Sequence, residues 1–271
     1  MRRAIVTLIA ALVVVVYASI ARAQAGAAGN NTLYNKLSPS VGPGGPPPVR
    51  DMSGVWTAQS LSARDSDPVP QMTPLAMERF KENRSEAKFG IVASNDPWKT
   101  CDPFGIPRGL VEETRGIAFG QMPGKIIVLH QYQKIWRDIW MDGRELPKNV
   151  DAQGGPPSRW YGYSVGHWEG DYTLVIDTIG ADDGSWMDGA GHPHSVDAHV
   201  QERYTRVDHN HMNYSITIDD PKMYAKPFVL GRNKYLLVPT QETEEQFCIP
   251  SEMLSYVQTI AVPSDTSEEK K

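Results

Sequence analysis

Cysteine is scarce in this sequence, which contains only Cys101 and Cys248 among 271 residues. Two cysteines cannot build a disulfide-rich scaffold or a four-cysteine zinc site. The sequence also lacks an H-E-x-x-H motif and a glycine-rich loop placed to bind phosphate before a helix. It therefore lacks the signatures of zinc proteases and of P-loop or dinucleotide-binding enzymes.

Long apolar runs are absent after the N-terminus. Residues 1–25, MRRAIVTLIAALVVVVYASIARAQA, combine two arginines, an apolar stretch and alanine-rich cleavage patterns. This order is typical of a secretory signal peptide, and an uncleaved membrane anchor is the alternative. We therefore expect an exported protein of the periplasm or the extracellular space, with no membrane partner after cleavage.

An excess of positive charge is also absent. The formal net charge is −5, and removal of residues 1–25, which hold three arginines and no acid, leaves −8. An acidic surface disfavours binding to nucleic acid and to anionic membranes. We expect a small-molecule ligand as the partner instead.

The chain divides into one domain with two disordered flanks. Residues 26–50 are rich in glycine and proline and predict a disordered tether, and residues 263–271 predict a disordered charged tail. The segment between them, residues 51–262, is long enough for one domain with a sizeable core. In an exported chain, Cys101 and Cys248 are expected to form one disulfide.

From about residue 115 the sequence alternates between apolar and polar residues and is rich in β-branched and aromatic types. Four strand pairs are predicted: KIIVLHQY with KIWRDIWM, the two halves of SRWYGYSVGHWEGDYTLVIDTIG, the two halves of HVQERYTRVDHNHMNYSITIDD, and PFVLGRNKYLLVP with EEQFCI. We expect an all-β antiparallel meander of about eight strands that closes into a lipocalin-like barrel, with a β-sandwich as the alternative. SGVW, residues 53–56, could add a strand. One short helix is expected after Thr73, with Pro74 at its first position.

Alternation also places two charged residues on apolar strand faces. Arg137 shares its face with isoleucines, and Glu202 shares its face with a valine and Tyr204. A buried charge is costly unless it is paired, so we predict that Arg137 and Glu202 pair across the barrel interior. A register shifted by one residue would instead bury Trp136 and Trp140.

Histidine is concentrated in WMDGAGHPHSVDAH, residues 186–199. His192 and His194 form an H-x-H pair, which could contribute two ligands to a zinc ion. However, Glu202 follows too late for the first cupin motif, and Pro193 disfavours a regular strand carrying both histidines. A polar loop with only local hydrogen bonds is the other alternative.

Acid–base chemistry is the use of this stretch that the residue types favour. A neutral histidine can accept or donate a proton, and a neighbouring carboxylate orients it. We expect His192 or His194 to act as the general acid or base and Asp188 or Glu202 to orient it. Arg137 would stabilise developing negative charge, and no metal or other cofactor is expected.

Aromatic residues recur on the predicted strands and are candidates for lining a cavity. Aromatic side chains suit an apolar or ring-containing ligand, with a few polar groups that set its orientation. The predicted substrate-binding residues are Trp140, Trp160, Tyr163, Trp168 and Tyr204.

The chain contains the segments IWMDGRELP, GYSVGHWEGDYTLVIDTIG, SWMDGAGHPHSVDAHVQERYTRVDHN and ITIDDPKMYAKPF, flanked by CDPFGIPRG and EQFC. Together they resemble a widespread, largely uncharacterised family of exported bacterial proteins with the pattern WEGDxxLVIDTIG, WMDGAGHPHS and ERYxRVDH. The resemblance covers residues 95–250. The pattern usually lacks the extra Tyr172, and its residue at the position of Asp138 is often basic. Because of these departures, the resemblance does not assign the partner of Arg137. The resemblance implies export and a common architecture, and it supplies no mechanism.

These observations predict an exported barrel that binds a small apolar or aromatic molecule. If the protein is an enzyme, we expect a cofactor-independent lyase, isomerase or hydrolase that uses histidine and carboxylate groups. A non-catalytic periplasmic carrier is the first alternative. A metal-dependent enzyme that uses the H-x-H pair is the second.

Overall fold

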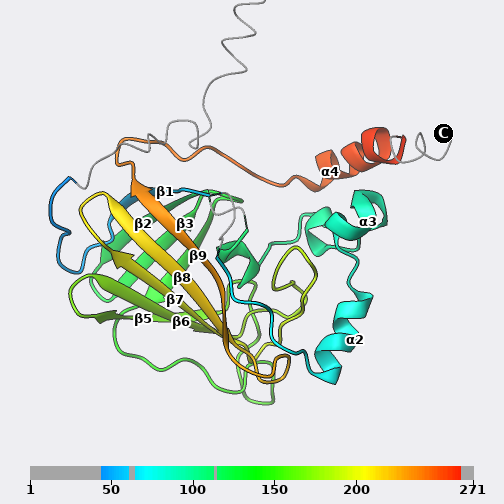
Figure 1. Cartoon of the computed structure of the whole chain (residues 1–271), viewed down its shortest axis with the longest axis horizontal. Helices are drawn as coiled ribbons and strands as arrows, with labels where there is room; N and C mark the ends of the chain where they lie inside the picture. The colour runs from blue at the N-terminus through cyan, green and yellow to red at the C-terminus, as the bar shows by residue number, and fades with distance from the viewer. Residues whose placement is uncertain (1–43, 61–64, 113–114, 264–271) are drawn as a thin grey trace, which may run out of the picture. The chain divides into compact units, whose positions relative to one another are not determined.

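Nine strands form a closed barrel in the computed structural model, which describes residues 44–60, 65–112 and 115–263 (Figure 1). The strands are β1 (Gly54–Ala58), β2 (Gly116–Met122), β3 (Lys125–His130), β4 (Ile135–Trp140), β5 (Tyr163–Glu169), β6 (Thr173–Ile179), β7 (His199–Arg206), β8 (His211–Asp219) and β9 (Phe228–Leu237). The predicted all-β barrel is confirmed, and the alternative of a β-sandwich is wrong. The predicted signal peptide, residues 1–25, lies outside the described residues, as do most of the tether and of the tail.

The strand count differs from the prediction at both ends of the chain. β2 is an addition to the predicted strands, because Gly116 and Gly120 weaken its strand pattern. The predicted strand EEQFCI, residues 244–249, is wrong. It contains only an isolated bridge between Gln246 and Tyr132, so β9 has no hairpin partner after it.

One strand pair breaks the antiparallel meander. β4 and β5 are parallel and share only two residue pairs, Ile139 with Ser164 and Trp140 with Val165. Parallel neighbours need a long connection, and the chain supplies it as the loop of residues 141–162. We call this contact the β4–β5 seam. All the other neighbouring strands in the barrel pair antiparallel. Their contacts are longer than the seam, although those of the short β1 strand are only slightly longer.

Short helices lie outside the barrel. They are α2 (Pro74–Glu82), α3 (Glu86–Ala93), the 3₁₀ turns η2 (Pro97–Thr100) and η3 (Arg108–Leu110), and at the C-terminal end α4 (Pro250–Tyr256) and the π-helical turn η4 (Val257–Ala261). The predicted helix is α2, and the Thr73 hydroxyl accepts a hydrogen bond from the Ala76 amide at 3.2 Å. The others were not expected; α3 is interrupted by Gly90 at a φ of 74°. No helix within the described ranges combines the length and the apolarity needed to cross a membrane.

The barrel interior follows the predicted alternation. On β7, Val200, Glu202 and Tyr204 are buried, and the residues between them are partly exposed. On β4, Arg137 is buried and Trp136 is 67% exposed, so the register with the tryptophans in the core is excluded. Charged and aromatic side chains therefore meet inside the barrel, as the alternation predicted.

The predicted disulfide joins two elements outside the barrel. Cys101 follows η2 and Cys248 precedes α4, with their Cα atoms 5.3 Å apart. A crosslink over so long a stretch of chain restricts the unfolded state strongly. The disulfide thereby ties the C-terminal segment to the loop that leads into β2.

Candidate functional site

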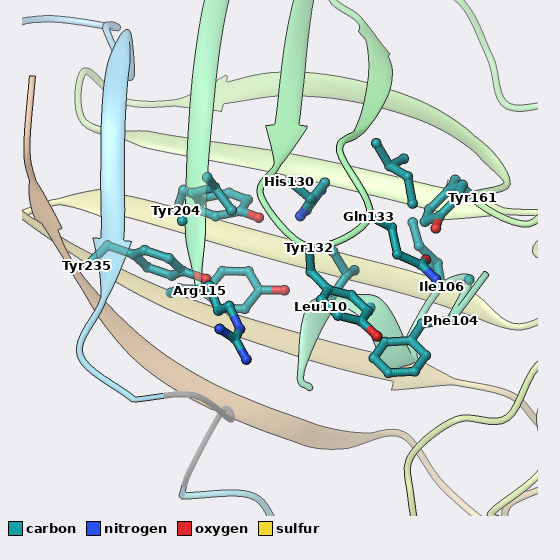
Figure 2. A pocket seen from close by; sticks show the side chains of 16 residues that line it. Phe104, Ile106, Leu110, Arg115, His130, Tyr132, Gln133, Tyr161, Tyr204 and Tyr235 are labelled. Carbon is teal, nitrogen blue, oxygen red and sulfur yellow. The ribbon is translucent and has the colours of Figure 1, made fainter. Parts of the chain in front are cut away.

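A cavity opens at the end of the barrel where β3 turns into β4 (Figure 2). Its enclosed part has room for about one water molecule, and most of the roughly 520 Å³ of space at this site is open to solvent. The segment before β2 forms one part of its lining, with Phe104, Ile106 and Leu110. The far lining consists of tyrosines from β7, β8 and β9, namely Tyr204, Tyr214 and Tyr235.

These three tyrosines form a continuous aromatic surface. Tyr204 and Tyr214 are opposite each other in the β7–β8 ladder, and their rings stack with centroids 4.7 Å apart. Tyr235 meets Tyr214 edge to face at 6.0 Å. Such a surface suits a flat or apolar ligand, and its hydroxyl groups add the capacity to form hydrogen bonds.

An ion pair lies in the barrel interior beside this surface. The Arg137 guanidinium donates to both Glu202 oxygens, at 2.7 and 3.1 Å, and both side chains are buried. The hydroxyls of Ser164 and Thr178 also accept from Arg137, at 3.2 and 3.3 Å. Tyr204 donates its hydroxyl to Glu202 at 2.8 Å. Burial opposes the charge of Arg137, but Glu202 outweighs this effect and raises the arginine pKa above its ordinary value. The two charges balance each other inside the barrel.

His130 brings an uncharged imidazole to the same cavity. Burial, together with the nearby charge of Arg137, lowers the His130 pKa to about 3. The ring is therefore neutral near pH 7 and can donate or accept one hydrogen bond at each nitrogen. Its Nε2 is buried and has no hydrogen-bond partner within the described residues.

The Tyr214 hydroxyl is a second buried polar atom without a partner in the described chain. It lies close to the Tyr204 hydroxyl, but no hydrogen bond of normal geometry joins them. Burial, with the neighbouring Glu202 charge, raises the Tyr214 pKa well above its ordinary value, so the hydroxyl keeps its proton. Unpaired buried polar atoms are rare because each loses its hydrogen bonds to water. The cavity thus holds two groups that a ligand could satisfy.

Residues 186–199, the histidine loop, form a separate polar region. His192 Nδ1 lies 2.7 Å from Asp188 Oδ2, and the ring stacks on Phe80 of α2 at a centroid distance of 4.7 Å. Both side chains of the pair are about one fifth exposed. This arrangement fixes the tautomer of His192 and leaves its Nε2 available for proton transfer.

His194 is fully buried and differs from His192 in its surroundings. Its Nδ1 donates to the Ser195 carbonyl oxygen at 3.2 Å, and its Nε2 lies 3.0 Å from Ser185 Oγ. Burial lowers its pKa, so the ring is neutral near pH 7. Both nitrogens of His194 therefore serve hydrogen bonds that hold the loop together.

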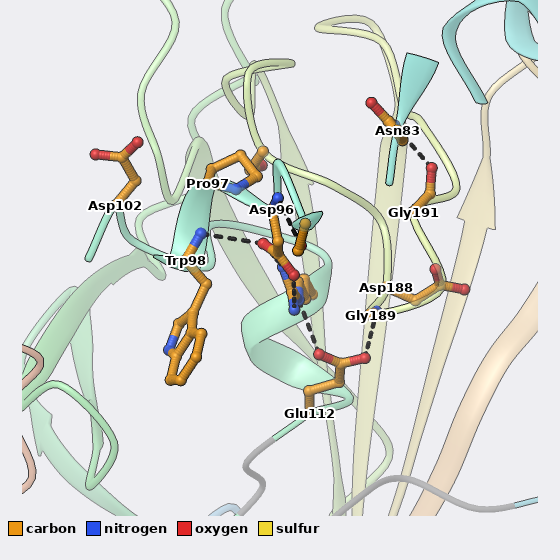
Figure 3. Close-up of polar contacts among 12 residues, drawn as sticks. Asn83, Asp96, Pro97, Trp98, Asp102, Glu112, Asp188, Gly189 and Gly191 are labelled. Atoms are coloured by element: carbon orange, nitrogen blue, oxygen red, sulfur yellow. Dashed lines mark hydrogen bonds and ion pairs between the residues drawn. The ribbon is translucent and has the colours of Figure 1, made fainter. Parts of the chain in front are cut away.

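A buried charge network anchors the histidine loop to η2, η3 and α2 (Figure 3). Arg108 pairs with Asp96 through two hydrogen bonds of 2.7 and 2.8 Å and with Glu112 at 2.8 Å. Glu112 in turn accepts from the backbone amide of Gly189. Burial disfavours the charged form of Arg108. The hydrogen bonds and charges of Asp96 and Glu112 outweigh this effect and raise the arginine pKa above its ordinary value. These contacts stabilise the fold of the loop.

The five predicted catalytic residues divide into two groups. Arg137 and Glu202 contact each other inside the barrel, whereas Asp188, His192 and His194 belong to the histidine loop. No hydrogen bond or ion pair between the two groups occurs in the described residues, and none of the loop residues lines the cavity.

The predicted aromatic residues also separate. Tyr204 lines the cavity, and Trp168 is partly buried against the core. Trp140, Trp160 and Tyr163 line a groove outside the β4–β5 seam.

The cavity residues His130 and Tyr214 were not among the predicted site residues. A signal for both exists in the sequence, because each shares an inward strand face with apolar residues two positions away. The signal that distinguishes them from core residues, the lack of a hydrogen-bond partner, is visible only in three dimensions.

Residues 162–166 read GYSVG and match the G-x-S-x-G pattern of serine hydrolases. In that fold the serine occupies a sharp turn between a strand and a helix. Here Ser164 is buried inside β5 and bonds with Thr178 at 2.8 Å. Its hydrogen bonds in the described chain include no histidine, so the motif does not form a nucleophile site.

The described residues contain no group of three histidine, cysteine or acidic side chains placed to hold a metal ion. No protein-family model, curated protein or solved structure matches this chain. The resemblance to exported bacterial proteins therefore remains an expectation. The features of the structure that bear on function are the cavity and the histidine loop.

Proposed function

We propose that this protein is an exported barrel that binds a small, ring-containing molecule at the open side of this cavity, with one polar group of the ligand reaching its narrow interior. The observation that carries the proposal is the presence of two unpartnered polar atoms, Tyr214 Oη and His130 Nε2, in an aromatic-lined cavity. A ligand that bonds to them would recover the hydrogen bonds that folding removes.

The electrostatics of the cavity favour an uncharged polar group at the buried end of the ligand. Arg137 is already neutralised by Glu202, and His130 is neutral. Beside His130 and Tyr214 a charged ligand group would find the Arg137 charge already paired, and burying it there would be unfavourable. Arg115, which also lines the cavity, is partly exposed. A carbonyl or hydroxyl oxygen on an aromatic or apolar body fits the donors and rings of the cavity.

Export is part of the proposal. The Cys101–Cys248 disulfide is compatible with an oxidising compartment. The predicted signal peptide at residues 1–25 supports the same location, in the periplasm or outside the cell.

Acid–base catalysis is the second candidate, and the Asp188–His192 pair favours it. A carboxylate bonded to Nδ1 is the arrangement that orients a catalytic histidine. Glu202 is less suited to accept a proton, because Arg137 and Tyr204 already donate to its oxygens. Such an enzyme would be a lyase, isomerase or hydrolase, and its substrate would have to reach His192.

The test begins with protein purified from the exported fraction under native conditions. We expect native mass spectrometry to detect a bound small molecule, which denaturation releases for identification. The Tyr214→Phe variant should bind the molecule more weakly, and the His192→Ala variant should bind it normally. Equal binding by wild type and Tyr214→Phe would contradict the proposed site.

Turnover of the identified molecule separates a carrier from an enzyme. Conversion by wild type, with binding but no conversion by His192→Ala, would support the catalytic candidate. Retention of the unchanged molecule by wild type would support the carrier.

A further inference from the structure

A second hollow lies outside the barrel, over the β4–β5 seam. It has a volume of about 1380 Å³ including the solvent at its open side. One wall consists of β4 and the start of β5, and the other belongs to the loop of residues 141–162. Structureless loops of this length are uncommon in small domains and are frequently functional. We call this hollow the seam groove.

Aromatic side chains are concentrated in the seam groove. Trp136, Trp140, Trp160 and Tyr163 all line it. Trp136 leaves 67% of its surface in solvent, which is unusual for so large an apolar side chain. The rings of Trp140 and Tyr163 are already covered by arginines, at centroid distances of 3.5 Å for Arg144 and 4.1 Å for Arg159. Trp136 and Trp160 have no such cover.

The charges along the seam groove are balanced with one exception. Arg144 pairs with Asp142 at 2.6 Å, and Asp138 pairs with Lys125 at 3.1 Å. Glu145, the other acidic side chain in the lining, pairs with Lys148 at 3.3 Å.

Arg159 is the exception, because its side chain has no ion pair or hydrogen bond with the described residues. Its guanidinium stacks on the Tyr163 ring. Stacking orients the plane of the guanidinium and leaves its N–H groups free to bind a carboxylate through two parallel hydrogen bonds.

We propose that the seam groove binds a carboxylate carried on a ring. Arg159 holds the carboxylate, and the exposed Trp136 and the partly exposed Trp160 cover the ring. Two sources share this chemistry, a free aromatic acid and an acidic sugar of a polysaccharide. Tyr161 lines both this groove and the barrel cavity, but Arg159, Trp136 and Trp160 line only the groove.

The experiment titrates wild-type protein with 2-naphthoate, with trigalacturonate and with the neutral analogue 2-naphthamide, using calorimetry. We expect saturable binding of at least one carboxylate and weaker binding of the amide. In the Arg159→Gln variant, affinity for the carboxylate should fall by about tenfold, the loss typical of one charge-assisted contact. The matched control is Arg50→Gln, which removes an exposed arginine away from the groove and should bind as wild type does.

Trp136→Ala supplies a second readout. Because Trp136 is exposed, its removal should leave the fold intact, as circular dichroism would verify. We expect weaker binding of the ring and a smaller ligand-induced change in tryptophan fluorescence. Binding of naphthoate alone would identify an aromatic acid, and binding of trigalacturonate alone would identify an acidic sugar.

Two results would overturn the proposal. The first is the absence of saturable binding of both carboxylates into the millimolar range. The second is equal affinity of Arg159→Gln and Arg50→Gln for the carboxylate that binds wild type. Neither result would affect the barrel cavity, which Tyr214→Phe tests separately.

Discussion

The histidine loop and the barrel cavity both bury polar side chains, but they satisfy them differently. In the loop, the ring of His194 is bonded at both nitrogens, and His192 is held by Asp188. In the cavity, His130 Nε2 and the Tyr214 hydroxyl have no partner within the described residues. The more histidine-rich region is therefore the one with fewer unsatisfied groups.

Residue type alone is therefore a poor guide to a binding site. A buried polar atom that is fully bonded contributes to the fold, and replacing it mainly costs stability. A buried polar atom without a partner already costs about 1–3 kcal/mol, which a ligand can recover.

The largest effect is expected for Glu202→Leu in the barrel interior. Loss of the carboxylate would leave the Arg137 charge buried without a partner, which should lower the free energy of unfolding by about 3–5 kcal/mol. The double variant Arg137→Met with Glu202→Leu removes both charges and should recover most of that loss. Urea unfolding measures both changes, and equal stability of the single and double variants would show that the charge is not isolated.

Acidification should destabilise both regions through their neutral histidines. The pKa values of His130 and His194 are lowered by folding, so the unfolded state binds more protons below pH 6.5. Above pH 6.5 these histidines are neutral in both states and the protein keeps its full stability. As pH falls below 6.5, the unfolded state takes up the protons first and stability is lost, and for His130 the loss continues to about pH 3. His130→Gln should remove about 2–3 kcal/mol of the decline in stability between about pH 6.5 and 4.5.

His199 provides a control of opposite sign for this titration. The hydrogen bond that His199 donates to Asp177 raises the His199 pKa, so its stabilising contribution is present below pH 6.5 and is lost as pH rises. In unfolding experiments His199→Gln should therefore remove a gain in stability that wild type shows as pH falls toward 6.5, and should leave the decline below pH 6.5 nearly unchanged. An unchanged stability of the variant above pH 6.5 relative to its value at 6.5 is expected, and a gain equal to that of wild type would contradict the assigned protonation states.

Removal of each loop histidine should affect stability without affecting the cavity. His194→Ala deletes a fully buried ring with two hydrogen bonds, and we expect a loss of about 2 kcal/mol. His192→Ala removes a partly exposed ring and should cost about 1 kcal/mol or less. Thermal unfolding measures both. Weakened binding in the cavity by either variant would show that the two regions are coupled.

No loss of stability is expected for Tyr214→Phe, because its hydroxyl has no partner to lose. Removal of the unpaired hydroxyl should raise the free energy of unfolding by up to about 1–3 kcal/mol. Tyr224→Phe is the matched comparison, since the Tyr224 hydroxyl donates to the Pro193 carbonyl oxygen at 2.6 Å in an equally buried position. That variant should lose about 1 kcal/mol. The same loss in both, by urea unfolding, would mean that Tyr214 has a partner after all.

The features of the fold that depend on local patterns were predictable from the sequence. Period-two alternation predicted β3 to β9, and it placed Arg137 and Glu202 on inward faces. The need to pair buried charges then predicted their contact. The cap of α2 at Thr73 was predictable for the same local reason.

Other contacts between distant segments were not predictable. The parallel pairing of β4 and β5 follows from the course of a long loop without regular structure. The stacking of His192 on Phe80 brings together residues from α2 and the histidine loop. No local pattern states that His130 and Tyr214 lack partners, because that depends on every neighbour in space.

The shortness of the β4–β5 seam has a consequence for the dynamics of the barrel. Two residue pairs are the entire strand contact that closes the cylinder at this point, whereas the β8–β9 contact continues along most of both strands. Local opening should therefore begin here, and the amides that donate across the β4–β5 contact should exchange with deuterium faster than those in the middle of β8. Such an opening would admit water to Arg137 without unfolding the rest of the domain.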